Sequence, residues 1–177
     1  INDVFFESDT VHALLDTEGG EFDQACAMDF CWLGFYDTWV MRDADGKTMR
    51  PFWPYFRAPQ DQAAVHARLP VPVNACWNGI TAFDARWFMN TTKSVSLPTL
   101  TAAMALPPHR PLQHQDDLDV AATVPLSFRS SSTCFASESL LSSLDMHRIS
   151  WPHRPRIYVN TDLVVTYDRP NYVLYGS

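Results

Sequence analysis

Three acidic side chains lie where an α/β protein collects ligands. Asp3 and Asp29 stand at the ends of apolar runs, and Glu138 stands at the start of a helical pattern. Carboxylates at strand ends can hold a hard cation that neutralises phosphate oxygens. Asp3 is the most suggestive, because Asn2 beside it offers a second oxygen ligand for one Mg²⁺- or Mn²⁺-type ion. The structural alternatives are an Asx turn for Asp3 and a favourable helix-dipole interaction for Glu138.

The segment NACWNGITAFDARWF, residues 74–88, combines aromatic rings with turn-forming residues. Asn and Gly are disfavoured inside strands, so the segment predicts a strand, a tight Asn-Gly turn and an aromatic wall. Trp77 could offer its indole face to the apolar side of a sugar, Asn78 could fix hydroxyl groups, and Gly79 lets the backbone approach closely. The alternative for Trp77 is an ordinary core position.

Composition excludes several classes of protein. With 177 residues, 46% hydrophobic and 19% charged, the chain is expected to form one globular domain. A net charge of -7 without a Lys/Arg cluster argues against a nucleic-acid partner. No apolar run is long enough to span a membrane, so we expect a soluble chain without membrane contact. Zinc chemistry is disfavoured because the sequence has no H-x-x-x-H or E-x-x-H pair, and no G-x-S-x-G elbow is present.

The start of the chain and the cysteines lead to two further expectations. Residues 1–6 form an apolar run without a preceding Met or cap, which predicts the tail of a strand that starts upstream, in a truncated chain. Four cysteines allow three pairings if all are bridged. Buried thiols or one structural disulfide in an oxidising compartment are favoured over a metal site.

Helices are expected in three places. One is capped by Ser8 or Asp9 and ends at Gly19-Gly20, and a second covers residues 60–69. The third begins at Ser137, with Glu138 in the first turn, leucines on one side and basic residues at its end.

Strands and loops occupy the rest of the chain. Pro54 excludes residues 51–56 from a central strand and predicts an aromatic loop. Prolines and an acidic run predict a long surface loop or disordered insertion over residues 89–124. Strands are expected over residues 22–30, 35–40, 156–160 and 163–167, the last two joined by an Asn-Thr-Asp turn.

Several sequence blocks, in this order along nearly the whole chain, resemble one family, the fungal cryptococcal mannosyltransferases, which are α-1,3-mannosyltransferases related to capsule-associated proteins. The blocks at residues 35–39 (FYDTW) and 76–85 (CWNGI-x-AFDA) are fairly specific. The others are the Asn-Asp-Val of residues 2–4, PFWPYF of 51–56, Pro-Val of 72–73, Phe-Arg of 128–129, Ser-Glu of 137–138 and PRIYVN of 155–160.

The resemblance implies a GT-A-like fold, the nucleotide-diphospho-sugar transferase architecture with a mixed sheet flanked by helices. Residues 1–177 would form a single partial domain, the metal and acceptor side of the enzyme. The implied donor is GDP-mannose, the acceptor is a mannose-terminated glycan, and the cofactor is Mn²⁺ or Mg²⁺. Transfer from an α-linked donor to an α-1,3 product means retention. The implied location is the Golgi lumen, in a membrane-anchored parent within the secretory pathway.

The same resemblance assigns roles to particular residues. Asn2 and Asp3 are similar to the acidic motif that holds the metal and diphosphate, and Glu138 is similar to the carboxylate at the start of the catalytic helix. Donor and acceptor binding is implied for Trp77, Asn78, Gly79, Asp37, Trp53 and Ser137.

Two other functions compete with this interpretation. A non-catalytic carbohydrate-binding or scaffold protein of capsule assembly would keep the aromatic residues without turnover. A glycoside hydrolase would need two carboxylates about 5 to 9.5 Å apart, for which Asp29 or Asp84 with Glu138 are the candidates.

Overall fold

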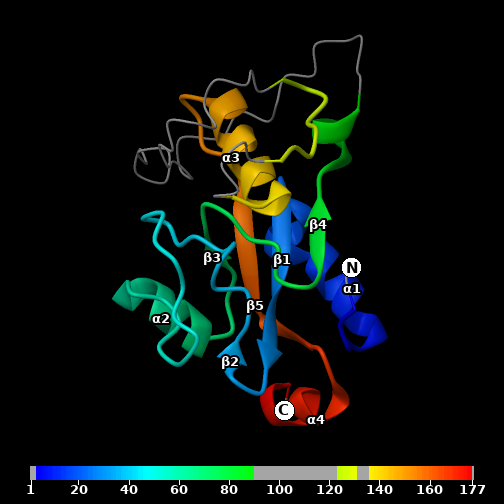
Figure 1. The fold of residues 1–177 in the computed structure, drawn as a ribbon, viewed down its shortest axis with the longest axis vertical. Coiled ribbons are helices and arrows are strands. Elements are labelled where there is room, and N and C mark those ends of the chain that lie inside the picture. The colour runs from blue at the N-terminus through cyan, green and yellow to red at the C-terminus, as the bar shows by residue number, and fades with distance from the viewer. Residues whose placement is uncertain (1–2, 90–122, 131–135, 177) are drawn as a thin grey trace.

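The computed structural model describes residues 3–89, 123–130 and 136–176, and it shows a mixed α/β fold in which helices surround one mixed sheet (Figure 1). Neighbouring strands follow the order β2-β1-β5-β3, and β4 pairs with β1 as well. The strands are β1 (Gln24–Cys31), β2 (Gly34–Phe35), β3 (Val71–Pro72), β4 (Thr81–Phe83) and β5 (Ile157–Thr166).

Strand β1 is the centre of the sheet. It is buried from Gln24 to Phe30, as its nearly continuous run of small and apolar side chains predicts for a strand covered on both faces. One edge of β1 runs parallel to β5. The other edge pairs antiparallel with β4 near its start and with β2 near its end. Between β4 and β2, this edge of β1 is therefore lined by a loop and not by a strand.

Two hydrophobic clusters cover the opposite faces of the sheet. Met28 and Phe30 point into the cluster against which Val65 of α2 packs. Ala25 and Ala27 point into the other cluster, with Leu14 of α1. None of the helices among the described residues is long and apolar enough to cross a membrane. The helices are α1 (Ser8–Leu15), α2 (Pro59–His66), α3 (Glu138–Ser150) and α4 (Arg169–Tyr175).

The start of α3 follows its sequence signals. The Ser137 hydroxyl accepts a hydrogen bond from the backbone N–H of Leu140 at 3.2 Å, and Glu138 lies in the first turn. A serine at this position satisfies one of the amide groups that a helix start leaves unpaired. The predicted capped helix is confirmed.

Helices also form in the regions of residues 8–20 and 60–69, as expected. The cap predicted for the first of these is wrong, because Glu7 is at the N-cap position without a side-chain cap bond. Helix α1 ends at Leu15, before the short 3₁₀ helix Thr17–Gly20.

The strand expected over residues 35–40 is wrong beyond Phe35. The backbone N–H of Asp37 donates to the carboxylate of Asp29 at 3.2 Å, and the N–H of Met41 donates to the Asp37 carbonyl at 3.2 Å. These bonds close a turn, because the Asp37 amide bonds to a side chain and not to the backbone of a neighbouring strand. Residues 36–40 therefore leave the sheet.

Two expectations at the ends of the chain also need correction. In the described part of the apolar start, residues 3–6, an isolated bridge between Phe5 and Thr166 forms in place of a strand tail. The two strands expected after residue 156 form the single strand β5, whose pairing shifts register between Cys26 and Met28 of β1. The N–H of Asp162 bonds to the Asn160 side chain inside this irregularity, so the predicted turn is absorbed as a bulge. Most of the segment 89–124 lies outside the described residues.

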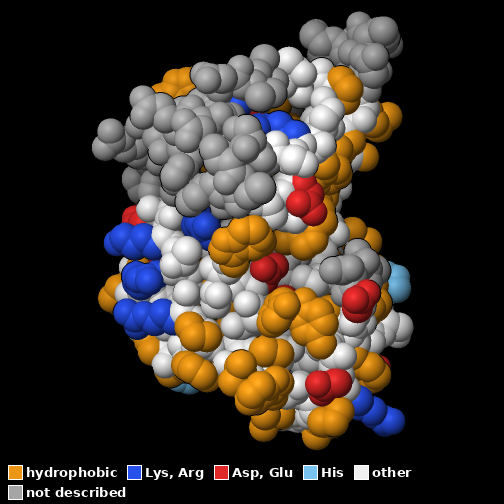
Figure 2. Space-filling model, viewed as in Figure 1, with side chains coloured by type: hydrophobic (Ala, Val, Ile, Leu, Met, Phe, Trp, Pro, Cys, Tyr) orange, Lys and Arg blue, Asp and Glu red, His pale blue; other side chains and the backbone are white. Residues whose placement is uncertain are grey.

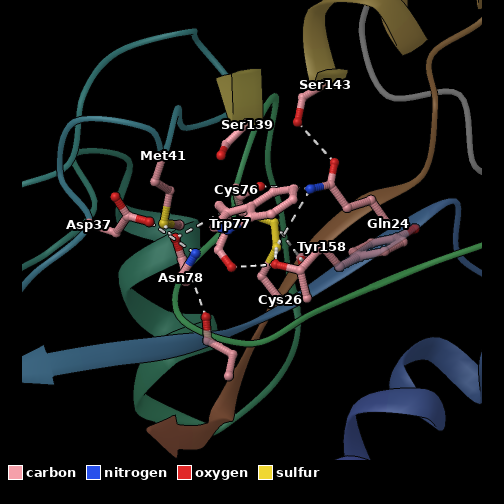
Figure 3. The surroundings of a disulfide bond; sticks show 12 residues. Gln24, Cys26, Asp37, Met41, Cys76, Trp77, Asn78, Ser139, Ser143 and Tyr158 are labelled. Carbon is pink, nitrogen blue, oxygen red and sulfur yellow. Dashed lines mark hydrogen bonds between the residues drawn. A yellow bond between two sulfur atoms is a disulfide. The ribbon is translucent and has the colours of Figure 1, made fainter. Parts of the chain in front are cut away.

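A disulfide joins Cys26 of β1 to Cys76, across a sequence separation of 50 residues. Both cysteines are fully buried, and Figure 3 shows the bond among the side chains that surround it. Cys31 is a partly exposed free thiol. The disulfide fastens the segment that precedes Trp77 to the central strand.

Replacing Cys26 and Cys76 together by Ala should lower the free energy of unfolding by about 4 kcal/mol, because a loop of this length in the unfolded chain is no longer closed. Urea denaturation followed by circular dichroism measures the change. Cys31→Ala is the matched control and should leave the midpoint close to that of the parent. A double variant as stable as the parent would contradict the assigned role of the disulfide.

Candidate functional site

The candidate site lies at the carboxyl ends of the parallel strands β1 and β5. Asp29, near the end of β1, is paired in register with Val165 of β5. Its carboxylate accepts a hydrogen bond from the hydroxyl of Tyr167, just beyond β5, at 3.4 Å. The carboxyl ends of neighbouring parallel strands are a common ligand position in α/β folds. The bridge between Phe5 and Thr166 places the start of the described chain beside the same strand end.

Asn78 fills the gap between β2 and β4 along the edge of β1. Its side-chain amide donates to the carbonyl of Ala27 at 2.9 Å, and its backbone N–H donates to the Asp37 carboxylate at 3.1 Å. The residue is fully buried and has a φ of 40°, a left-handed conformation that Asn tolerates better than most residues. The Asn-Gly turn predicted from the sequence is confirmed.

Gly79 permits a close approach between three segments. Its φ is 70°, and a Cβ atom there would lie 2.8 Å from a methyl group of Val4 and 3.1 Å from one of Val165. A side chain would therefore clash in addition to straining the backbone. The contact with Val4 places neighbouring Asp3, which is exposed and has a φ of 36°, next to the Asn78-Gly79 turn.

Two carboxylates share this part of the site. Asp29 is fully buried, and burial together with the nearby charge of Asp37 raises its pKa to about 7. Burial also raises the pKa of Asp37, while the hydrogen bond from Asn78 acts in the opposite direction. Burial and the neighbouring Asp29 carboxylate raise the pKa of Tyr167. Near neutral pH the pair therefore holds less than two full negative charges.

Trp77 connects the loop to helix α3. Its ring lies 5.8 Å from that of Phe83 and 5.8 Å from that of Phe128 (centroid distances), and it packs against a cluster that contains Val40 and Leu140. Val40 belongs to the turn that carries Asp37, and Leu140 belongs to the first turns of α3. The start of α3 is thereby placed against both the loop and the turn, and the Trp77 ring is partly buried in this contact.

Gln24 connects the loop of Cys76 to helix α3, as Figure 3 shows. Its side-chain amide donates to the carbonyl of Cys76 at 2.6 Å, and its carbonyl oxygen accepts from the hydroxyl of Ser143 on α3 at 2.9 Å. Gln24 is fully buried on β1. One side chain thus fixes the distance between the central strand, the disulfide loop and α3.

The structure brings most of the predicted site residues into one neighbourhood. Asp37 is hydrogen-bonded to Asn78, and Gly79 follows Asn78 in the chain. Val4 packs against Gly79, and Asp3 is the residue before Val4. Trp77 and α3 continue the site on its other side. Glu138 itself is exposed at the start of that helix, where the Ser137 hydroxyl forms the helix cap.

Of the predicted residues that the structure describes, Trp53 does not join this group. The Trp53 ring is about half exposed and contacts Tyr55 and His66 on the α2 side of the protein. Asn2 lies outside the described residues. Sequence reasoning also assigned no role to Gln24, Tyr36 or Tyr167. Their roles depend on contacts formed in the folded chain, with Cys76 and Ser143 for Gln24 and with β1 for the two tyrosines, which leave no local signal.

The expected metal ligand that the structure describes is Asp3, an exposed carboxylate. Among the described residues, no three or more His, Cys, Asp or Glu side chains gather in a way that could hold a metal ion. Mg²⁺-type ions are commonly bound by one or two carboxylates together with substrate phosphates and water. An exposed Asp3 fits that pattern as a single protein carboxylate.

Comparison with known proteins identifies the class of protein. The family model described as Cryptococcal mannosyltransferase 1 matches residues 1–145. This chain therefore belongs to the cryptococcal mannosyltransferase 1 family, as the sequence blocks suggested. No curated protein and no solved structure matches the chain.

The buried acid predicts a pH-dependent stability. The usual pKa of an Asp is 3.8, whereas folding raises that of Asp29 to about 7. Between these values folded Asp29 keeps a proton that the unfolded chain loses, so its contribution lowers stability as pH rises through this window. Asp29→Asn removes the effect, and its stability relative to the parent should rise by up to about 1.4 kcal/mol per pH unit.

Urea denaturation of both proteins at several pH values from 4 to 7.5 measures the difference. Asp9→Asn, an exposed position on α1, is the control for losing a carboxylate outside the buried pair. The prediction would be contradicted if the free energy of unfolding changed with pH in the same way for the parent and Asp29→Asn.

Proposed function

We propose that this chain transfers mannose from GDP-mannose to a mannose-terminated glycan, forming an α-1,3 linkage with retention, on a GT-A-like scaffold. Membership of the mannosyltransferase family supports the reaction class. The mixed sheet with a parallel central pair is compatible with the scaffold. The observation that carries the proposal is the convergence around the Trp77-Asn78-Gly79 loop, with Val4 on one side and the start of α3 on the other.

The start of the chain is the proposed cation site. Asp3, with Asn2 beside it in the sequence, would hold Mn²⁺ or Mg²⁺ together with the donor diphosphate. When bound, such an ion stabilises negative charge on the departing diphosphate. The exposure of Asp3 and its place beside the ends of β1 and β5 suit this role.

The remaining residues would bind and orient the two sugars. Asn78 and Gly79 are buried, so their role would be to hold the loop that carries Trp77 in place beside the bound sugars. Glu138, exposed at the start of α3, would orient the acceptor hydroxyl or stabilise positive charge on the donor ring in an oxocarbenium-like transition state. Retention does not require Glu138 to act as a base.

The disulfide bears on the compartment. Disulfides persist in oxidising environments such as the secretory pathway and are rare in the cytosol. The buried bond between Cys26 and Cys76 therefore supports the Golgi lumen or another secretory compartment as the site of action.

A non-catalytic glycan-binding protein is the second candidate, favoured by the exposed aromatic side chains near the site, Tyr36 and Trp39. Metal dependence separates the two. Binding of GDP-mannose should fall after chelation with EDTA if the chain is a transferase. A binding module would keep its affinity for α-1,3-mannobiose and show no measurable affinity for the nucleotide sugar.

Glu138→Gln should reduce the rate of mannose transfer at least tenfold while the thermal unfolding curve remains that of the parent, because the charge near the reacting centre is lost. The assay measures transfer from GDP-mannose to α-1,3-mannobiose in the presence and absence of Mn²⁺. Glu18→Gln, at an exposed glutamate near the end of α1, is the matched control and should transfer at the parental rate. Near-parental rates for Glu138→Gln would refute the assignment.

A further inference from the structure

Tyr36 and Tyr167 form an exposed pair of aromatic rings at the candidate site. Their ring centroids lie 4.7 Å apart in an edge-to-face arrangement, with the residues 56% and 37% exposed. Hydrophobic side chains gather over the lower half of the face in Figure 2, where Figure 1 places β2 and α4. Tyr36 directly follows β2, and Tyr167 comes between β5 and α4. We refer to the two rings as the tyrosine platform.

The platform is held in place by the buried acid behind it. The Tyr167 hydroxyl donates to the side chain of Asp29, and the backbone N–H of Tyr36 donates to the carbonyl of Asp29 at 3.0 Å. The N–H of Thr38 then donates to the Tyr36 carbonyl at 2.8 Å, which tightens the turn. An exposed aromatic surface that is already ordered loses little conformational freedom when a ligand binds to it.

A carboxylate stands at the side of the platform. Asp37 is adjacent to Tyr36 in the same turn, and its charge interacts with the phenol of Tyr167. One of its oxygens accepts the N–H of Asn78 at 3.1 Å. A carboxylate offers about four acceptor positions, so Asp37 keeps the capacity to accept hydrogen bonds from a ligand at its half-buried surface.

This combination selects a neutral, polyhydroxylated ring. A pyranose presents an apolar C–H face to aromatic rings and donates hydroxyl hydrogens to a carboxylate at its edge. A diphosphate brings negative charge towards Asp29 and Asp37 and is repelled there. Within the proposed reaction, the acceptor sugar meets these requirements better than the nucleotide end of the donor.

We propose that the tyrosine platform and Asp37 form the acceptor subsite, which binds a pyranose ring of the acceptor glycan. The inference rests on the proposed transferase function for its role in turnover. It moves the aromatic floor from Trp77, whose ring is packed against Phe83 and Phe128, to rings that solvent can reach.

The test measures binding of α-1,3-mannobiose to the purified chain by saturation-transfer NMR, with competition to obtain the Kd. Tyr36→Ala should weaken binding about tenfold through loss of the ring face. Tyr36→Leu keeps apolar bulk without an aromatic face and should behave similarly. Tyr167→Phe keeps the ring but loses its anchor to Asp29, and should weaken binding by a smaller factor. Trp151→Ala, at an exposed position directly after α3, is the control and should bind as the parent does.

Two kinetic readouts separate this subsite from the rest of the reaction. In Tyr36→Ala the KM for mannobiose should rise, while the KM for GDP-mannose and the slow hydrolysis of GDP-mannose without acceptor stay at parental values. Parental mannobiose affinity in both Tyr36 variants, or a parent that does not bind mannobiose, would overturn the subsite. An equal loss of donor hydrolysis and transfer in folded Tyr36→Ala would also overturn it. A different result would reject the transferase function and leave the subsite standing. In that case the parent would neither hydrolyse the donor nor transfer mannose, but the Tyr36 variants would still lose mannobiose binding.

Discussion

A single buried carbonyl group constrains the whole site. The edge of β1 is paired by β4 near its start and by β2 near its end, and the carbonyl of Ala27 lies between them. An unsatisfied buried carbonyl costs about 1 to 3 kcal/mol. The side chain of Asn78 supplies the missing donor, which requires the side chain to point inward and the backbone to adopt a left-handed turn. Gly79 then follows because the second turn position also has positive φ and has no room for a Cβ atom.

This interior bond determines the electrostatics of the surface above it. With its side chain turned inward, Asn78 directs its backbone N–H at Asp37, which comes to lie beside buried Asp29. Two carboxylates in one poorly solvated place titrate as a pair, and the more buried one keeps its proton to higher pH. The surface therefore offers hydrogen-bond acceptors with limited charge. That property suits hydroxyl groups, while Asp3 is exposed and would hold the cation of the proposed reaction.

Local signals in the sequence predicted the parts of the fold that local physics decides. The Ser137 cap with Glu138 in the first turn located α3, and the Asn-Gly pair located the tight turn. The strand expected beyond Phe35 failed because the carboxylate of Asp29, on the preceding strand β1, accepts the Asp37 amide hydrogen.

Partners distant in sequence explain the parts of the site that prediction missed. The strand end at Asp29 was recognised as a possible ligand position. The phenol of Tyr167, 138 residues away, became its partner only through the parallel pairing of β1 with β5. The aromatic character of the loop was likewise clear from the sequence. Which rings would be covered and which would face solvent depended on how α3 packs.

The loop of residues 76–79 is rigid because it has three attachments to β1. The disulfide at Cys26 alone would leave it free to pivot, but hydrogen bonds at Gln24 and Ala27 fix its direction on either side of that bond. Gln24 also binds Ser143, so α3 is positioned from the same point of the strand. Group transfer depends on reacting groups held in a narrow range of geometry. A frame anchored at Gln24, Cys26 and Ala27 of one buried strand would provide that precision for the proposed transfer.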